Sequence, residues 1–360
     1  MAPLRIGITG AADIARKNVR AIGIVKDACE VVAVGSRTQA KAQAFIQETG
    51  LAGRAKAYGS YQAVLDDPDV EAVYVPLPTG MHLEWVLKAC AARKHILLEK
   101  PLSLSNGDLD TMLGAAREAG VQLMDGTMWS HNPRATAMSR VLQAQVAPVR
   151  DVRATLAFRA PETFLANDIR VQPELDGLGA IGDVGWYCVR ASLLAYDWQP
   201  PQSVTAHPGA VLNAAGVPLY AGATLLWPRA SESEPQRRAT LTCSFESSIT
   251  QDLIITGDGG SLILDDFCIP HHEAQQTFTV RCHTGVGFQD LAVGTTVTKE
   301  EHRLTLPEPQ EAAMWREFTR CVRAVQAGGA PDENWVGRTA TTQRVVQAWY
   351  DSVRGGGCTR

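Results

Sequence analysis

The segment LRIGITGAADIARK, residues 4–17, sets the architecture of the amino-terminal half of the chain. Its pattern predicts a short apolar strand, a tight turn of small residues and a helix that continues to about Val25. Backbone donors and the helix dipole at such a turn favour a phosphate group. Compared with the dinucleotide pattern GxGxxG, Ala12 and Ala15 replace the second and third glycines, so an ordinary strand-to-helix turn is the alternative. The dinucleotide contacts expected here come from the turn and the first helical residues: Gly10, Ala12, Asp13 and Ile14.

The next predicted strand, residues 30–35, ends in Ser36 and Arg37 and leads to a helix from about residue 39 to residue 49. In an NAD site, an acid at this strand end binds the adenosine ribose hydroxyls. A hydroxyl and a guanidinium favour a 2′-phosphate instead, because arginine binds phosphate with two hydrogen bonds and Lys41 adds charge. We therefore expect NADP(H) in preference to NAD(H). The alternative is a solvated helix start.

Two further strands follow, at residues 71–76, ending in Pro76, and at residues 95–98. The second ends directly in Glu99-Lys100-Pro101, at the edge where open α/β sheets bind ligands. Proline restricts the backbone, so Lys100 is a candidate for a defined direction, although a strand end with solvated charges explains the tripeptide equally well. His82, between the strands, either lines a nicotinamide pocket or contacts a neighbour at a helix start.

Strand and helix alternate five times up to residue 124, which predicts a parallel doubly wound (Rossmann) domain over residues 1–128. Beyond residue 148 the period changes to two, as at residues 152–158 and 239–245. We expect a second α/β domain, residues 129–330, built on a large, mainly antiparallel sheet with a hairpin at residues 257–260. Residues 284–302 look irregular, a helical stripe begins at Glu311, and a last helix from about Thr339 to Val353 closes the chain within residues 331–360.

One segment of the second region has several features of a site. Gly177, Gly179 and Gly182 precede Asp183 and Tyr187. If a helix begins at Asp183, these two polar side chains are four residues apart and share a face. They form either a structural hydrogen bond or, with Arg170 upstream, a polar substrate pocket. Two aromatic side chains are further candidates for contacts with hydroxyls or a sugar ring, or else are packing residues: Trp129 and His131.

Composition limits the range of functions. The chain has 360 residues and a formal net charge of −4, which provides no basic field for nucleic acid or anionic lipid. The amino terminus shows no leader, and the uncharged run at residues 209–227 is interrupted by glycine and proline. The eight cysteines form no CxxC pair, and neither His271-His272-Glu273 nor Cys282-His283 has a recognised zinc spacing. We expect a cytoplasmic protein without a metal, a membrane partner or a nucleic-acid partner.

Taken together, the amino-terminal turn, Glu99-Lys100-Pro101 and the Gly177–Tyr187 segment resemble the Gfo/Idh/MocA oxidoreductase family over nearly the whole chain. The resemblance implies a Rossmann domain joined to an α/β domain, with Lys100 beside the nicotinamide. Many members have Asp-x-x-x-His where this chain has Asp183 and Tyr187. In this respect the chain is similar to the branch of glucose-fructose oxidoreductase and dimeric dihydrodiol dehydrogenase, whose tyrosine donates the proton. It also resembles plant proteins known only as uncharacterised oxidoreductases. Ala12 departs from the usual glycine.

These observations predict an NADP-dependent dehydrogenase or reductase that acts on a hydroxyl-bearing small molecule, such as an aldose, a polyol or a cyclic trans-diol. Lys100, Tyr187 and Asp183 are the expected catalytic residues. A phenol with a pKa near 10 is a poor acid at neutral pH, and a nearby ammonium lowers that pKa. The alternative is a non-catalytic, NADP-binding regulatory protein on the same fold.

We also expect a homodimer that forms through the exposed face of the antiparallel sheet. Three small β-forming side chains, rather than the lysines that usually protect such surfaces, are expected on that face: Thr240, Thr242 and Ser244.

Overall fold

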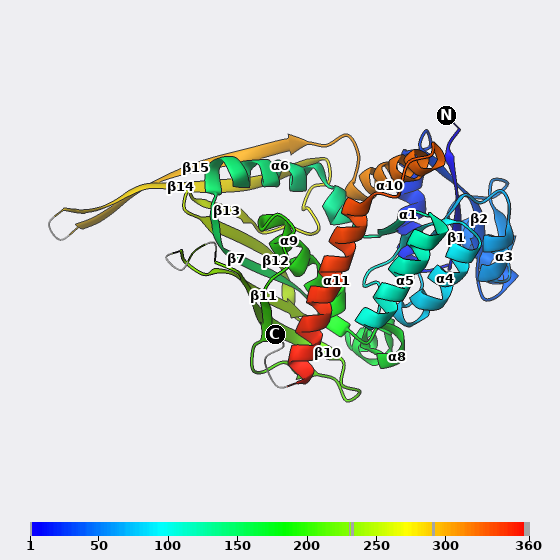
Figure 1. The fold of residues 1–360 in the computed structure, drawn as a ribbon, viewed down its shortest axis with the longest axis horizontal. Coiled ribbons are helices and arrows are strands. Elements are labelled where there is room, and N and C mark those ends of the chain that lie inside the picture. The colour runs from blue at the N-terminus through cyan, green and yellow to red at the C-terminus, as the bar shows by residue number, and fades with distance from the viewer. Residues whose placement is uncertain (1, 230, 232–233, 290–291, 356–360) are drawn as a thin grey trace. The chain divides into compact units, whose positions relative to one another are not determined.

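The computed structural model describes residues 2–229, 231, 234–289 and 292–355, and the side chains of all of these except 283–289 and 292–296. The chain divides into two compact units, each with its own sheet (Figure 1). The first unit comprises residues up to 131, residues 174–176 and residues 308–343. The second unit comprises residues 132–173, 177–307 and those after 343. Residues 308–330, which the sequence analysis assigned to the second region, therefore belong to the first unit.

The sheet of the first unit has six parallel strands in the order β3-β2-β1-β4-β5-β6. This is the doubly wound Rossmann order, with the switch point between β1 and β4. The strands are β1 (Leu4–Thr9), β2 (Cys29–Gly35), β3 (Lys56–Tyr58), β4 (Ala72–Val75), β5 (His95–Leu98) and β6 (Leu123–Asp125). The helices between them are α1 (Asp13–Ile24), α2 (Gln39–Glu48), α3 (Tyr61–Asp66), α4 (His82–Ala91) and α5 (Asn106–Ala119), with a short 3-10 turn η1 (Thr79–Met81) before α4.

One strand and one helix of this unit, β3 and α3, were not predicted from the sequence. Both are short, and β3 has no fully buried residue from which an apolar pattern would be recognised. Their close contact with the sheet explains the glycine that ends β2, because a Cβ on Gly35 would lie 2.6 Å from Val64 and 2.8 Å from the carbonyl oxygen of Ser60. The remaining strands and helices of the unit agree with the predicted alternation.

Two carboxyl-terminal helices complete the first unit. Helix α10 (Gln310–Gln326) contributes Trp315, Phe318 and Val322, all fully buried, to a core shared with β1, α1 and β2. Helix α11 (Glu333–Arg354) begins six residues before the position that the sequence suggested and runs from the first unit into the second. The apolar stripe predicted from Glu311 onward is thus the face of α10 that packs on the Rossmann core.

The second unit contains a nine-stranded mixed sheet in the order β15-β14-β13-β12-β7-β11-β10-β8, with β9 paired to β10. Strands β7 and β11 are parallel, and the other pairs are antiparallel. The strands are β7 (Val149–Arg159), β8 (Ser203–Ala206), β9 (Val211–Leu212), β10 (Pro218–Trp227), β11 (Arg237–Ser244), β12 (Glu246–Gly257), β13 (Ser261–Leu264), β14 (Gln275–Gln289) and β15 (Ala292–Thr305). The prediction that residues 284–302 are irregular is wrong for residues 284–289, which belong to β14, and for residues 292–302, which belong to β15. Residues 290–291 of that range lie outside the described residues.

The helical segments of the second unit lie mostly between β6 and β8 in the sequence. They are α6 (Pro133–Val141), η3 (Leu142–Val146), α7 (Glu162–Asn167), η4 (Ile169–Val171), η5 (Ile181–Gly185) and α9 (Trp186–Ala195). The short helix α8 (Pro173–Asp176) lies in the same stretch of sequence, but its residues from Glu174 onward belong to the first unit. A 3-10 turn, η2 (Met128–His131), precedes them at the end of the first unit. Helix α9 packs on β7 and β11 and buries nearly all its side chains.

Alternation in β11 determines which side chains reach the surface. Ala239, Leu241 and Cys243 are fully buried, whereas Thr240 and Thr242 on the opposite face are partly exposed. Ser244, predicted on the exposed face, is buried, with its hydroxyl accepting a hydrogen bond from the backbone of Glu246. The predicted orientation is therefore correct for the two threonines and wrong at the end of the strand.

Candidate active site

The turn after β1 has the features of a phosphate site. Gly10 has φ +149°, a region that favours glycine, and a Cβ there would lie 3.2 Å from the side chain of Leu77. Helix α1 begins after Ala12, which offers no side-chain cap. Three other helices of the unit have a capping residue whose side-chain hydroxyl accepts a hydrogen bond from a backbone N–H of the first turn. These residues are Thr38, Ser60 and Ser105. The start of α1 thus fits an anion that takes the place of a cap.

Asp13 and Ile14, the first residues of α1, are both exposed. Asp13 forms an ion pair with Arg16 at 3.4 Å, and 40% of Ile14 remains accessible. The apolar side chain of Ile14 is the kind of surface on which a nucleotide packs.

At the end of β2, the groups expected to bind a 2′-phosphate lie at the surface of the unit. Ser36 is buried, and its backbone N–H donates to the carbonyl oxygen of Tyr58 at 3.1 Å. Arg37, which precedes the capping residue Thr38, and Lys41, on the first turn of α2, are both exposed. Burial raises the pKa of Tyr61 above its ordinary value, and the positive charge of Arg37 acts in the opposite direction. No acidic side chain occupies residues 36–38, so the residues fit NADP(H).

The segment that follows Lys100 is held by buried side chains of the first unit. The His82 ring nitrogens lie 3.0 Å from the carbonyl oxygen of Leu102 and 2.8 Å from that of Leu77, and burial lowers the pKa of His82. Gln343 of α11 accepts from the Leu102 backbone N–H at 2.9 Å and donates to the Ser103 carbonyl oxygen at 3.0 Å. His82 therefore joins the loops after β4 and β5.

Thr79 also contacts the segment that follows Lys100. Its hydroxyl lies 3.3 Å from the carbonyl oxygen of Pro101 and also hydrogen-bonds the carboxylate of Asp176. The Lys100–Pro101 peptide is cis, and Lys100 itself is half-buried. Thr79, Asp176 and Gln343 had no signal in the sequence analysis because they are isolated polar residues on otherwise ordinary helices and turns. Pro76, at the end of β4, is buried close to Gly10.

In the second unit, glycines let the segment before α9 pass close to other parts of the chain. Gly179 has φ +55°, and a Cβ there would lie 2.2 Å from the carbonyl oxygen of Pro218. A Cβ on Gly185 would lie 2.9 Å from the indole ring of Trp349 in α11. The spaced glycines thus fix η5 against β10 and α11.

Asp183 does not begin a helix, contrary to the prediction. It lies in the π-turn η5, and the regular helix α9 starts at Trp186. The turn places Asp183 beside Arg170, whose Nε is 3.1 Å from a carboxylate oxygen of Asp183. Arg170 also contacts the carboxylate of Asp168 at 2.9 Å. Arg170, the arginine expected to bind substrate, thus contacts two carboxylates. Tyr187 lies on the first turn of α9 and is 7% exposed.

The two aromatic candidates, Trp129 and His131, belong to η2 of the first unit. Trp129 is 1% exposed. The ring of His131 is stacked on Trp335 with centroids 4.3 Å apart. The indole of Trp335 in turn donates a hydrogen bond to Glu317 at 2.8 Å. These contacts are packing contacts within the first unit. Substrate binding by the two side chains stays a prediction.

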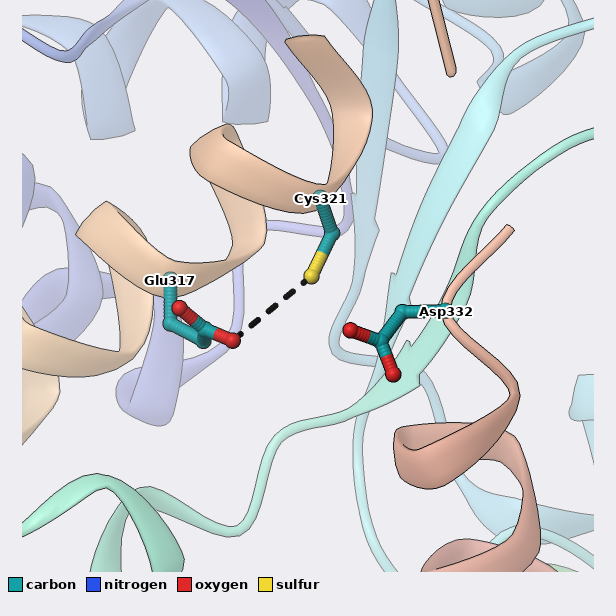
Figure 2. A group of neighbouring side chains, drawn as sticks. All are labelled: Glu317, Cys321 and Asp332. Atoms are coloured by element: carbon teal, nitrogen blue, oxygen red, sulfur yellow. Dashed lines mark hydrogen bonds between the residues drawn. The ribbon is translucent and has the colours of Figure 1, made fainter. Parts of the chain in front are cut away.

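Figure 2 shows Glu317, Cys321 and Asp332, the only group of potential metal ligands among the described side chains whose donor atoms lie within 4.8 Å of one another. Arg320 donates to Glu317 at 2.7 Å, to Asp332 at 3.2 Å and to the Cys321 sulfur at 3.4 Å. Burial raises the pKa of the Cys321 thiol to about 12, so the thiolate that metals prefer is disfavoured. The guanidinium already supplies the positive charge of this cluster. His283, one of the residues weighed for zinc, has a side chain outside those described.

Several known proteins are similar to this chain in sequence and architecture. The model of the oxidoreductase family with an NAD-binding Rossmann fold, GFO_IDH_MocA, matches residues 4–127. A dTDP-3,4-didehydro-2,6-dideoxy-alpha-D-glucose 3-reductase from Streptomyces violaceoruber is 36% identical over 264 residues, which cover 73% of this chain and 72% of that protein. The chain belongs to the Gfo/Idh/MocA oxidoreductase family. The resemblance indicated by the three motifs is thereby confirmed.

Other Gfo/Idh/MocA members differ in how much of their length is matched. D-xylose 1-dehydrogenase (NADP(+)) 2 from Haloferax volcanii is 36% identical over 191 residues, so the chain spans 57% of that relative and the match covers 53% of this chain. The solved structure of KijD10, a 3-ketoreductase from Actinomadura kijaniata in complex with NADP and TDP-benzene, covers 98% of both chains with 28% identity and a TM-score of 0.77. Structures of that reductase include variants in which one tyrosine or one lysine is replaced. In the part of the chain that the structure describes, no helix combines the length and apolar character needed to cross a membrane.

Proposed function

We propose that this protein is an NADP(H)-dependent oxidoreductase that interconverts a carbonyl and an alcohol on a sugar-like small molecule. The observation that supports this most is the arrangement of the first unit. An uncapped helix start, a strand end with Arg37 in place of an acid, and Lys100 all follow strands of one parallel sheet at their carboxyl ends. The relatives named as NADP-dependent or solved with NADP support the choice of cofactor.

NADP(H), when bound, supplies or accepts the hydride. Tyr187 donates the proton that the developing alkoxide requires. Lys100 lowers the pKa of that phenol and polarises the carbonyl, because a nearby positive charge favours the phenolate. Asp183, held by Arg170 at 3.1 Å, accepts hydrogen bonds from substrate hydroxyls and orients the ring. Gly10, Ala12, Asp13 and Ile14 hold the pyrophosphate, and Ser36, Arg37 and Lys41 hold the 2′-phosphate.

The substrate class rests on the relatives and on the polar character of the Asp183 segment. A xylose dehydrogenase and a nucleotide-sugar 3-reductase are among the similar proteins, which favours an aldose or a keto-sugar over an apolar alcohol. Purified protein should be incubated with NADPH or NADP⁺ and a panel of aldoses, keto-sugars, polyols and cyclic trans-diols. We expect turnover with at least one hydroxyl-rich member. Tight NADPH binding without turnover on any of them would favour the regulatory alternative.

We further propose a homodimer that forms through the outer face of the nine-stranded sheet. Five partly exposed side chains from four neighbouring strands lie on that face: Thr155, Thr224, Thr240, Thr242 and Ile254. Such short side chains permit close sheet packing. Arg153 and Arg238, both paired with Asp151, place charges on the same side of the sheet. Light scattering at micromolar concentration should give twice the chain mass, and a monomeric mass would contradict the proposal.

A further inference from the structure

Three buried side chains of the first unit form a hydrogen-bonded relay that ends at Glu99, next to Lys100. Trp315 Nε1 of α10 lies 2.8 Å from Asn18 Oδ1 of α1. Asn18 Nδ2 lies 2.8 Å from the Tyr74 hydroxyl of β4, and that hydroxyl hydrogen-bonds Glu99 Oε1. Trp315 and Tyr74 are fully buried, and Asn18 is 2% exposed. None of these three residues was predicted from the sequence to have a functional role.

The direction of each hydrogen bond in the relay follows from the indole, which can only donate. Because Trp315 donates to Asn18 Oδ1, the Asn18 amide nitrogen must supply the other contacts. Its two hydrogens are directed to the Tyr74 hydroxyl and to the carbonyl oxygen of Ile14 at 3.1 Å. The Tyr74 oxygen is therefore an acceptor toward Asn18, and its single hydrogen goes to Glu99.

A fixed donor directed at a carboxyl oxygen stabilises the charged form of that carboxyl group. Relays of this kind are strong in a buried setting because each bond polarises the next. Glu99 is thereby held as an oriented anion at the carboxyl end of β5, on the β4–β5 side of the switch point. In a doubly wound sheet the two halves of a dinucleotide lie on opposite sides of that point. Because Arg37 lies on the β2 side, the nicotinamide half belongs over β4 and β5.

We propose that the relay of Trp315, Asn18 and Tyr74 positions Glu99 so that its negative charge stabilises oxidised nicotinamide, and thereby strengthens NADP⁺ binding relative to NADPH binding. The inference rests on the proposed function, because it requires the cofactor at this edge. The oxidised ring carries a positive charge and the reduced ring is neutral, so a nearby carboxylate distinguishes the two. Tyr74 and Trp315 are positioning residues, which act through Glu99.

The test is direct titration of the full chain with NADP⁺ and with NADPH, which needs no substrate. Tyr74→Phe removes one oxygen and keeps the ring, which packs edge-on against Trp315 at 5.6 Å. The ratio of the NADP⁺ Kd to the NADPH Kd should rise by roughly 3- to 10-fold in Tyr74→Phe and in Glu99→Gln, the size expected for a partly solvated charge pair. Trp315→Phe should raise the same ratio by about 2-fold, because it removes only the hydrogen bond that orients Asn18.

Matched controls come from the second unit. Tyr196→Phe removes a buried hydroxyl that donates to the carbonyl oxygen of Arg238 at 2.7 Å, and Trp227→Phe removes an indole N–H that donates to Gln199 at the same distance. Both should keep the parent ratio.

The outcomes separate the relay from the function itself. A parent protein that binds neither nucleotide would refute the proposed function. A parent that binds both, with an unchanged ratio in Tyr74→Phe or in Glu99→Gln, would refute the relay and leave the function standing. If Trp315→Phe does not fold, Tyr74→Phe decides the matter, because it deletes a single atom and leaves the packing of the core intact.

Discussion

The two units hold their functional residues in different ways. In the first unit, Arg37 and Lys100 follow strands directly, so the parallel sheet brings them to one edge. In the second unit, Asp183 lies in a π-turn and Arg170 in a 3-10 turn, and their positions depend on contacts between separate segments. The proposed cofactor contacts can therefore be predicted from strand ends, whereas the proposed substrate contacts depend on irregular backbone. Substitutions in the two units should accordingly have separable effects.

The largest effect should come from Lys100, which is proposed to assist the proton transfer from Tyr187. Lys100→Met keeps the length of the side chain and removes its charge. Turnover should fall by roughly 10²- to 10⁴-fold, the range for loss of a group that assists proton transfer. NADPH affinity, measured by fluorescence titration, should change much less. Lys88→Met, which removes a partly exposed lysine paired with Glu84, is the matched control and should keep parent turnover.

Cofactor choice should depend on the first unit alone. Arg37→Asp replaces a charge-assisted contact by repulsion and should weaken NADPH binding by roughly 10²-fold while NADH binding changes little. Isothermal titration with both cofactors measures this directly. Equal or tighter binding of NADH by the parent protein would contradict the assignment of Ser36, Arg37 and Lys41.

Acid should destabilise the first unit through a buried histidine. Burial lowers the pKa of His95, at the start of β5, to about 4, and its Nδ1 accepts a backbone hydrogen bond from Gln122. The folded-state pKa lies below the unfolded value of about 6.5, so the contribution to stability is complete above pH 6.5 and is lost as pH falls toward 4. Between pH 6.5 and 5 the loss should be about 2 kcal/mol.

His95→Asn provides the comparison, because its side-chain oxygen can still accept from Gln122 but does not titrate in this range. Hydrogen exchange of β4 and β5 peptides should become faster with acid in the parent and less so in the variant. Burial also lowers the pKa of His82, so His82 makes the stability of both proteins fall with decreasing pH. Equal pH dependence in parent and variant would show that His95 does not contribute.

The smallest effect should come from Arg170 of the second unit. Arg170→Met leaves Asp183 without its ion pair at 3.1 Å. The KM for the sugar substrate should rise by about 10-fold, in line with the loss of one charge-assisted hydrogen bond, while the Kd for NADPH stays constant. Arg170→Lys should recover part of the loss. A change in NADPH affinity instead would show that the two units are not separable in this way.

The sequence predicted most of the first unit because buried parallel strands and amphipathic helices have strong periods, and it missed only elements as short as β3 and α3. It also predicted Lys100 and Arg37 as strand-end residues. The contacts of Thr79 and Gln343 with the segment that follows Lys100 could not be predicted, since Gln343 lies 241 residues from the Leu102 backbone that it contacts. Isolated buried polar residues show no periodicity, and only the folded chain reveals their partners.

In the second unit, alternation identified the buried face of β11 but not the register or the parallel pairing with β7. The π-turn at Asp183 was also missed, because a π-turn has no sequence period that distinguishes it from the start of an α-helix. The long β14–β15 ribbon looked irregular since glycines and threonines interrupt its apolar pattern.

The central claim is that the first unit binds the cofactor and Tyr187 of the second unit completes the reaction. Tyr187→Phe removes only a hydroxyl, so one stopped-flow experiment on this variant, premixed with NADPH and then given the best substrate of the panel, tests it most directly. We predict an NADPH Kd within about 2-fold of the parent and a single-turnover rate lower by roughly 10²-fold or more. The double variant with Lys100→Met should lose less than the product of the two single losses, because groups that act as a unit are not additive. A single-turnover rate close to that of the parent would contradict the account.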